Sequence, residues 1–295
     1  MTFCTVATCY LVFTNFPEVI YSLLPMTLSN NLPQATLLLR QLGFVLMIEA
    51  QRYLVCVVLG FIAWTWWRRK AGSNVRLQSR PIQRSQLARE MFYSTTSILV
   101  FALVSIVIMV ISGKSHRFFY AHFSDRGLPY FVLSIPVMMA VQDTYFYWTH
   151  RLMHHRALFR FFHRTHHLST NPNPLTTYSI NPLEAVVDAG GSILILFFVP
   201  KHVVAYLIFT WVNTAYAVYG HLGHEVLPAS WGRHWFGRWI NTSVAHNIHH
   251  ARARYNFGWY SLFWDRWMNT IDPDYEAQMQ GRTVSTRTPF NSAAQ

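Results

Sequence analysis

The feature that most constrains this chain is an apolar stretch, Met91–Ser112, that contains no charged side chain. A helix of about 20 predominantly apolar residues is long enough to cross a bilayer. Further apolar runs occupy residues 44–67, 129–148, 185–199 and 202–219. We interpret the first two of these as membrane spans and the last two as a helical hairpin. Residues 3–25 are also apolar, but Pro17 and Glu18 interrupt them, so whether this segment crosses the membrane is left open.

Composition agrees with a membrane protein. Hydrophobic residues make up 52% of the chain and charged residues 12%, whereas soluble domains carry roughly a quarter charged residues. A large soluble protein would need far more polar surface than these segments supply. The sequence therefore predicts an all-α, polytopic bundle of membrane helices.

The basic residues give the bundle an orientation. The net charge is +12, and seven basic residues fall in one short segment between two apolar runs: Arg68, Arg69, Lys70, Arg76, Arg80, Arg84 and Arg89. Such a cluster is typical of a cytoplasmic loop beside an anionic membrane surface. The basic residues form no separate face, so nucleic acid is not expected as a partner.

The expected topology places the histidine-rich segments on one side of the membrane. If residues 68–90 are cytoplasmic, the span 91–112 leads outward and 129–148 returns. The hairpin 185–219 then leaves and returns again. Residues 150–167 and 221–250 both reach the cytoplasmic face in this arrangement, so we expect an integral membrane protein with its histidine site facing the cytoplasm.

Thirteen of the fifteen histidines lie between His150 and His250. Eight of them form three boxes, one HxxxH and two HxxHH: His150 and His154; His163, His166 and His167; His246, His249 and His250. Residues three and four apart share a helix face, so each box is expected to aim its imidazoles at one point. Eight converging nitrogens are too many for one ion, which predicts two metal ions with open positions for other ligands. Imidazole suits iron, zinc, copper or nickel, so spacing alone does not choose the metal.

The remaining histidines divide into expected ligands and bystanders. His221 is favoured as a ligand where the hairpin returns, with His224 added less securely. The predicted metal ligands are therefore His150, His154, His163, His166, His167, His221, His224, His246, His249 and His250. A ligand role for His155 is left open. His116, His122 and His202 are expected on the opposite membrane side, and they and His234 are read as structural or surface residues.

Carboxylates near the boxes are candidates for orienting the ligands. Asp143 lies inside a span, where an ionisable group is costly and usually functional, and it precedes His150 by two helical turns on the same face. It could bond a ligand imidazole, or instead pair with Arg151 or Lys114. Glu184 follows the second box, with Asp188 one turn later, and Glu225 follows His224. Asp143 and Glu184 are the predicted catalytic residues, whereas Asp265 is read as part of a structural ion pair.

These residues together resemble the fatty acid hydroxylase/sterol desaturase superfamily, from about Arg89 to Thr270. The gap between the first two boxes, from His154 to His163, is short, as in this family. The resemblance also rests on motifs around the boxes: Asp143-Thr-Tyr-Phe-Tyr-Trp-Thr-His150-Arg, Ser169-Thr-Asn-Pro-Asn-Pro, Asn181-Pro-Leu-Glu184-Ala, Gly220-His221, Tyr255-Asn256-Phe-Gly258 and Phe263-Trp-Asp265-Arg266. Asn181 and His224 depart from the pattern, since many members have histidine and tyrosine there.

The resemblance implies a membrane-bound non-haem di-iron oxygenase. It implies two iron ions as cofactor, O₂ as co-substrate, and electrons from an NAD(P)H-linked donor protein such as a ferredoxin or a b-type cytochrome. It further implies hydroxylation or desaturation of a lipid, such as a sterol or fatty acyl chain, and the sequence does not choose between the two reactions. The expected organisation is an N-terminal membrane and basic-loop region (1–90), a catalytic domain (91–270) and a polar C-terminal tail (271–295), with residues 229–240 forming an interfacial helix.

Two other classes of function remain as alternatives. A membrane metal transporter or sensor would also carry histidine clusters, but transporters place their ligands at mid-membrane between broken helices. A membrane cytochrome needs facing histidines within the spans to hold haem. A zinc protease is least expected because the chain has no HExxH motif.

Overall fold

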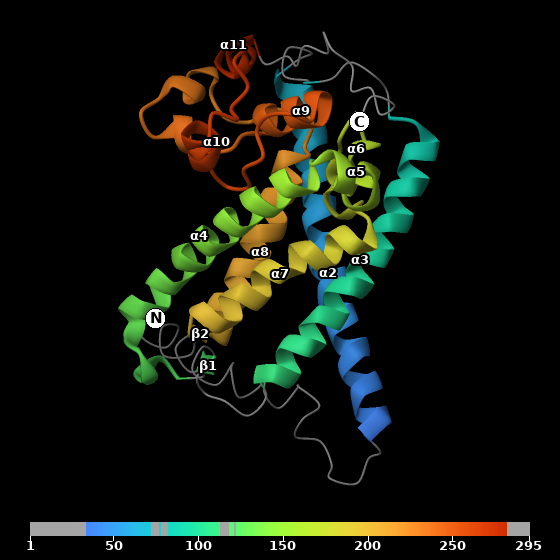
Figure 1. Ribbon diagram of the computed structural model, residues 1–295, viewed down its shortest axis with the longest axis vertical. Coiled ribbons are helices and arrows are strands. Elements are labelled where there is room, and N and C mark those ends of the chain that lie inside the picture. Colours follow the sequence, from blue (N-terminus) through green and yellow to red (C-terminus); the bar gives the residue numbers. More distant parts are fainter. Residues whose placement is uncertain (1–33, 72–76, 78–81, 113–117, 121, 282–295) are drawn as a thin grey trace, which may run out of the picture.

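The computed structural model describes residues 34–71, 77, 82–112, 118–120 and 122–281. Residues 3–25 and His116, on which two sequence predictions fall, lie outside this set. Five long helices dominate the structure (Figure 1): α2 (Gln34–Ala71), α3 (Arg84–Ser112), α4 (Gly127–Met153), α7 (Pro182–Phe198) and α8 (Val203–Gly220). The chain is an all-α membrane bundle, as the apolar segments predicted.

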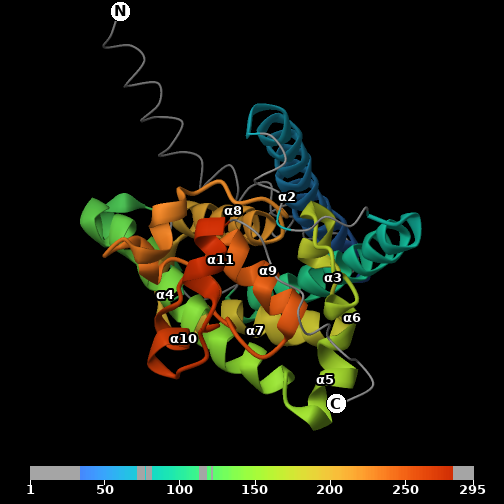
Figure 2. The ribbon, with the colours of Figure 1, turned by 90° about the horizontal axis from the view of Figure 1, so that it is seen from above.

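The five long helices form a closed ring. α2 packs against α3, α3 against α7, α7 against α4, α4 against α8, and α8 returns to α2. The last contact is close because Gly60 has no side chain: a Cβ there would lie 2.6 Å from Cγ1 of Val218. In a view along the long axis of the molecule, α9 (Ser243–Arg252) lies over the centre of the ring (Figure 2).

Three helices are long and apolar enough to cross a membrane: Ala35–Trp66, Arg84–Ser112 and Val203–Gly220. The predicted spans 129–148 and 185–199 do form helices, α4 and α7. Within the described residues, however, neither helix is both long enough and apolar enough to be a candidate membrane span. α7 has 17 residues, which at 1.5 Å per residue gives about 26 Å, shorter than the hydrocarbon core of about 30 Å. α4 and α7 instead complete the ring together with these three helices.

The basic segment and the histidine boxes lie at the same end of the ring. α2 ends there with Arg68-Arg69-Lys70-Ala71, and α3 begins there at Arg84. The end of α4, the short helices α5 (Arg156–Phe162) and α6 (Arg164–His167), the end of α8, and α9 gather at this end too (Figure 1). The parity of the predicted topology is therefore reproduced, because each helix reverses the direction of the one before.

The opposite end holds His202 in a purely structural role. Two short strands pair in parallel there, β1 (Phe119–Tyr120) with β2 (Lys201–His202). The His202 ring is buried and stacks on Phe123 with 4.5 Å between centroids. The neighbouring Lys201 ammonium donates to the carbonyl oxygens of Ile195 (3.3 Å) and Val199 (3.2 Å) at the end of α7. Burial lowers the pKa of Lys201 to about 7.

Short elements form a cap over the histidine end: η4 (Ala229–Arg233), η5 (Gly237–Trp239), α10 (Phe263–Trp267) and α11 (Tyr275–Gly281). Residues 229–240 form two 3-10 helices instead of the single interfacial helix expected, although Trp235 is 76% exposed. The sequence suggested a polar tail from residue 271. However, Tyr275 and Met279 of α11 are buried against Ile248 and Leu262, because their large apolar side chains cover α9.

A buried carboxylate fastens the loop after the second box to the ring. Glu90 of α3 is fully buried and accepts hydrogen bonds from Ser169 Oγ (2.7 Å), Asn173 Nδ2 (2.8 Å) and Thr176 Oγ1 (2.9 Å). Gln86 Nε2 donates to it as well, at 2.8 Å. The loop ends in η3 (Pro174–Tyr178), which Asn173 caps by accepting from Leu175 N. Glu90 therefore explains Ser169 and Asn173, the first and last residues of the Ser169-Thr-Asn-Pro-Asn motif.

We predict that Glu90→Ala lowers the free energy of unfolding by at least about 3 kcal/mol. The reason is that several buried donors lose their acceptor, each costing about 1–3 kcal/mol. The thermal midpoint in detergent should fall by several degrees. Ser85→Ala, at an exposed position of the same helix, is the control and should leave the midpoint unchanged. An unchanged midpoint in Glu90→Ala would show that the loop is held by other contacts.

Candidate metal centre

Nine histidines converge at the capped end of the ring in two adjacent groups. In each group the potential ligand nitrogens lie within 4.8 Å of one another. The first group is His150, His154, His163, His167 and His249, and the second is His166, His221, His246 and His250. The rings of His167 and His250, one from each group, have centroids only 5.1 Å apart. All of these side chains are buried except that of His154, which is partly exposed.

The second and third boxes each divide between the two groups. His163 and His167 belong to the first group, whereas His166 belongs to the second; in the third box His249 belongs to the first group, and His246 and His250 belong to the second. This differs from the expectation that each box aims at one point. Positions i+3 and i+4 of a helix lie about 100° apart at 3.6 residues per turn, so they flank position i on opposite sides. The pair at i and i+4 stays together and the residue at i+3 turns to the neighbouring group.

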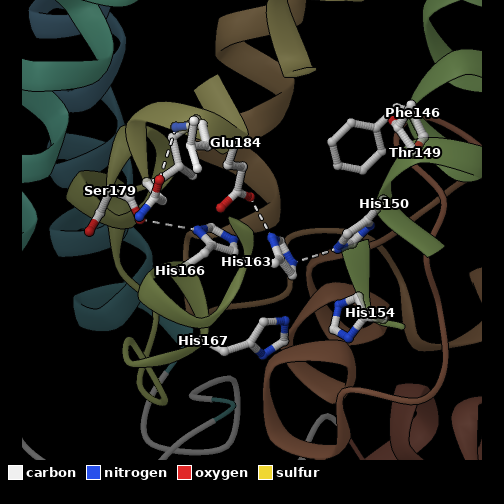
Figure 3. Close-up of polar contacts among 12 residues, drawn as sticks. Phe146, Thr149, His150, His154, His163, His166, His167, Ser179 and Glu184 are labelled. Atoms are coloured by element: carbon white, nitrogen blue, oxygen red, sulfur yellow. Dashed lines mark hydrogen bonds and ion pairs between the residues drawn. The ribbon is translucent and has the colours of Figure 1, made fainter. Parts of the chain in front are cut away.

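In several of these imidazoles the nitrogen that faces away from the group, here called the outer nitrogen, is hydrogen-bonded. This hydrogen bond determines which of the two ring nitrogens carries the proton. His150 Nδ1 lies 2.9 Å from the carbonyl oxygen of Phe257 and therefore donates to it. His163 Nδ1 contacts the Glu184 carboxylate. A neutral imidazole has one N–H, so Nε2 of both rings carries a lone pair. Yet these two Nε2 atoms face each other at 2.9 Å (Figure 3).

The second group repeats this arrangement. His221 Nδ1 donates to the carbonyl oxygen of Ala217 at 2.7 Å, and His166 Nδ1 donates to that of Ser179 at 3.4 Å. Their Nε2 atoms again face each other, 3.3 Å apart. Two lone pairs at such a distance repel unless a cation lies between or beside them. The donor set therefore fits a metal ion in each group.

Protons are poor substitutes for that cation. Burial, with the neighbouring imidazoles adding to it, lowers the pKa of His150 and His163 well below the usual value of 6.5. Burial likewise lowers the pKa of His166 to about 4 and that of His249 to about 3. The imidazoles are therefore neutral at physiological pH, which is the form that binds metal.

The two predicted catalytic carboxylates have different positions. Glu184 contacts the outer nitrogen of His163, an imidazole of the first group (Figure 3). Asp143 does not reach an imidazole. It accepts instead from the backbone N–H groups of Tyr260 (2.7 Å) and Ser261 (3.0 Å) and from the Ser261 hydroxyl (2.5 Å). It therefore positions the loop 255–261 rather than a ligand directly.

Asp265 holds the same loop from its other side. Its carboxylate accepts from the N–H groups of Phe257 and Gly258, each at 2.8 Å, and from Thr270 Oγ1 at 2.7 Å. Among the described residues Asp265 forms no ion pair, although a structural one was expected, and the neighbouring Arg266 lies 3.7 Å from Glu276. Burial raises the pKa of Asp265 to about 6, against the lowering effect of these hydrogen bonds.

The loop 255–261 supplies carbonyl groups that the sequence did not point to. The carbonyl oxygen of Tyr255 accepts from His249 Nδ1 at 2.8 Å, and that of Phe257 accepts from His150 Nδ1. Asn256 between them has φ of 58°, a left-handed conformation that asparagine tolerates better than most residues. The Tyr255-Asn256-Phe-Gly258 motif was the available signal, but backbone acceptors cannot be read from side-chain chemistry.

Two other histidines lie apart from both groups. His224, which was among the predicted ligands, is buried but its ring packs edge-on against Trp64 of α2, 5.6 Å between centroids. His155 is exposed and accepts from Ala157 N at the start of α5. Asn181, where a histidine was expected from the resemblance, caps α7 by accepting from Leu183 N at 2.9 Å.

Comparison with known proteins supports the family resemblance. Residues 135–270 match the family model described as fatty acid hydroxylase. This match agrees with the resemblance to the fatty acid hydroxylase/sterol desaturase superfamily that the motifs indicated. All nine clustered histidines and both loop-holding carboxylates fall within the matched residues.

Several curated proteins are similar to part of the chain. The chain is 28% identical over 131 residues to a Delta(7)-sterol 5(6)-desaturase of Schizosaccharomyces pombe, covering 44% of each protein. It is 26% identical over 126 residues to the lathosterol oxidase of Rattus norvegicus, covering 42% of each. A Delta(7)-sterol 5(6)-desaturase of Gibberella zeae is 26% identical over 133 residues, 45% of this chain and 38% of that protein. The matches thus span less than half of these relatives, and no solved structure matches the chain.

We predict that Asp265→Ala loosens the loop that supports His150 and His249. Two buried N–H groups lose their acceptor, at about 1–3 kcal/mol each, so their amide hydrogen exchange should accelerate by at least about tenfold. Exchange measured by mass spectrometry on a peptide covering 256–262 tests this. Asp274→Ala is the control, since that carboxylate is 62% exposed. Equal exchange in both variants would contradict the assigned role of Asp265.

Proposed function

We propose that this chain is a membrane-bound non-haem di-iron oxygenase that hydroxylates or desaturates a lipid, such as a sterol or fatty acyl chain. The main observation behind this proposal is that unprotonated imidazole nitrogens face each other within two adjacent groups at one end of the helix ring. The names of the relatives, sterol desaturases and lathosterol oxidase, support a lipid substrate. Both reactions consume O₂ with two electrons and two protons, and hydroxylation releases one water where desaturation releases two.

The donor set is consistent with iron. Imidazole nitrogens suit iron among the transition metals, and the superfamily supports that choice. The first group would hold one ion and the second group the other, with Glu184 and the carbonyls of Phe257, Tyr255 and Ala217 fixing the ring orientations. Iron bound there would supply O₂ activation and the oxidation of an unactivated C–H bond.

The protein's own contribution is to position the lipid and exclude water. A cavity inside the helix ring is lined by residues of all five long helices, and one of them, Phe146, has its ring 4.7 Å from that of His150. About half of the lining residues are apolar or aromatic, and these would hold a lipid chain away from solvent, which protects a reactive oxidant from side reactions. Electrons would come from an NAD(P)H-linked donor protein, a ferredoxin or a b-type cytochrome, as in the superfamily.

The geometry disfavours the two alternative functions. A transporter places its ligands at mid-membrane, whereas these groups lie at the ends of α4 and α8. A haem needs two imidazoles separated by a flat macrocycle. In the first group, His150 and His249 have ring centroids 4.5 Å apart and His154 and His163 have centroids 4.7 Å apart, so the clustered rings leave no such slot among the described residues.

We further propose that the metal centre faces the cytoplasm. The basic ends of α2 and α3 at the histidine end support this orientation. Exposed Trp235, Trp239 and Trp267 on the same cap, beside Arg238 and Arg266, suit the interface between lipid and water. The division into residues 1–90, 91–270 and 271–295 remains a prediction, with α11 belonging to the cap by its packing.

We predict that His166→Ala and His249→Ala each abolish product formation while the protein still inserts into membranes. Each variant removes a ligand from a different group. Lipid profiling by mass spectrometry of cells with and without the protein measures the product. His155→Ala is the control and should retain activity because that ring is exposed. Turnover retained in both ligand variants would refute the oxygenase proposal.

We predict that the purified protein binds about two iron ions per chain and that His221→Ala lowers this number. His224→Ala should leave it unchanged, since His224 lies outside both groups. Elemental analysis of protein purified without added metal measures the content. Loss of iron in His224→Ala, or full iron content in His221→Ala, would show that the ligand set differs from the two groups described.

A further inference from the structure

Glu225 is a buried carboxylate that lies beside the second histidine group without contacting an imidazole of it. The residue has no exposed surface. Its oxygens accept hydrogen bonds from three donors: the Tyr219 hydroxyl at 2.8 Å, Leu227 N at 2.9 Å and Val244 N at 3.1 Å. A charge is costly to bury unless hydrogen bonds compensate for the lost water. Three donors from separate parts of the chain supply that compensation here.

The bonds of Glu225 join the two helices that carry ligands of the second histidine group. Tyr219 belongs to α8 and lies two residues before His221, whereas Val244 belongs to α9 and lies two residues before His246. Oε1 accepts from Tyr219 and Oε2 from Val244, so the carboxyl group bridges the two helix ends. The two histidines that follow are a facing pair, with 2.9 Å between their Nε2 atoms.

The same two helix ends are in direct contact. Gly220 has no side chain, and a Cβ there would lie 3.5 Å from Cδ2 of the His246 ring. At the start of α9, Ser243 Oγ donates to the carbonyl oxygen of Gly220 at 3.3 Å. At 1.5 Å per residue, each bridged residue lies only about 3 Å along the chain axis from the ligand that follows it. A change in the separation of the helix ends therefore changes the distance between the imidazoles.

Capping of α9 alone does not account for Glu225. Thr242 already caps this helix by accepting from Ala245 N at 3.1 Å. A carboxylate near a helix N-terminus is favourable because the helix dipole is positive there, but this effect requires no bond to Tyr219 on another helix. Asp265, beside the first group, likewise accepts from two backbone N–H groups and one hydroxyl. The second group thus has a counterpart to the carboxylate that holds the loop 255–261.

Resting on the proposed function, we infer that Glu225 is a positioning residue of the second metal position. It bridges α8 to α9 and thereby sets the separation of His221 and His246. The bridge acts through the two helix backbones and supplies no ligand atom itself. Opening it at either end is therefore expected to weaken metal binding while all nine clustered histidines remain in the chain.

Two conservative substitutions open the bridge at opposite ends. Glu225→Gln keeps the size of the side chain and one acceptor oxygen for Tyr219, but its NH₂ group cannot accept from Val244 N. Tyr219→Phe keeps the ring and removes only the hydroxyl. Each has a matched control. Glu276→Gln makes the first substitution at a carboxylate that is 49% exposed, and Tyr130→Phe removes a tyrosine hydrogen bond near the start of α4, at the other end of the ring.

Binding of Co²⁺ measures the effect. Purified full-length protein is freed of metal with a chelator and titrated with Co²⁺, whose visible absorption depends on the ligands around it. We expect each bridge variant to lower the Co²⁺ affinity by at least about tenfold, since groups that orient metal ligands typically contribute about 10–100-fold. The double variant should lose about as much as either single variant, because both substitutions open the same bridge. The two controls should bind Co²⁺ like the unchanged protein.

The thermal midpoint of the metal-free protein is measured in parallel, because it separates positioning from general stabilisation. A lower midpoint with unchanged Co²⁺ affinity would make Glu225 a structural residue only and would overturn the inference. A fall in affinity in only one bridge variant overturns it as well, since a bridge needs both ends. The same holds if the double variant loses the product of the two single effects, or if either control loses affinity.

Lipid product and iron content, measured on the unchanged protein, keep the two proposals apart. Co²⁺ binding that depends on the bridge, in a protein that contains no iron and forms no product, would defeat the oxygenase proposal and leave the role of Glu225 intact. Product formation by a protein whose Co²⁺ affinity is the same in both bridge variants would defeat the positioning role alone. A protein that binds no Co²⁺ would overturn both.

Discussion

The architecture of the capped end depends on one interaction, in which unprotonated imidazole nitrogens face each other. His150 and His163, held by Phe257 O and Glu184, present lone pairs to each other, and so do His221 and His166. Without a cation these contacts are repulsive, and burial makes protonation an ineffective remedy. The helix ends, the cap and the loop 255–261 are therefore arranged around positive charge that the protein itself does not supply.

The supporting groups are chosen to keep those lone pairs in place. Carbonyl oxygens accept from the outer nitrogens of His150, His166, His221 and His249. Asp143 and Asp265 in turn hold the loop that carries two of these carbonyls. Removing either carboxylate would leave the ligands themselves intact but would free the segment that aims them. The orientation of the imidazole rings thus depends on the carbonyl groups that they contact and on the carboxylates that hold those carbonyl groups.

Features encoded locally could be predicted from the sequence. The five long helices and the convergence of nine histidines follow from apolar runs and from the spacing of the boxes. Glu184 lies one loop beyond the second box and contacts His163, where its position suggested it would lie; its catalytic role stays a prediction. Asp143 was expected to bond an imidazole or to pair with Arg151 or Lys114, but its partners come from a loop more than a hundred residues away, and such long-range contacts leave no local pattern.

The misassigned His224 shows the same limit. Its spacing from His221 suggests a shared direction, but Gly223 adopts a φ of 69° between them, which ends the helix and turns the second imidazole toward Trp64. The polar tail was misjudged for a related reason. Tyr275 and Met279 are isolated among polar residues, and only the surface of α9 shows why they are buried.

The division of the second and third boxes between the two histidine groups has a consequence for assembly. If each group holds an ion as proposed, each of these short helices would be anchored to both ions at once, and vacating one position would withdraw support from segments that also serve the other. Loading would accordingly be cooperative, with a half-filled centre the least populated form. The same double anchoring would tie α6 to α9, which are far apart in the sequence, and metal binding would then complete the folding of this end.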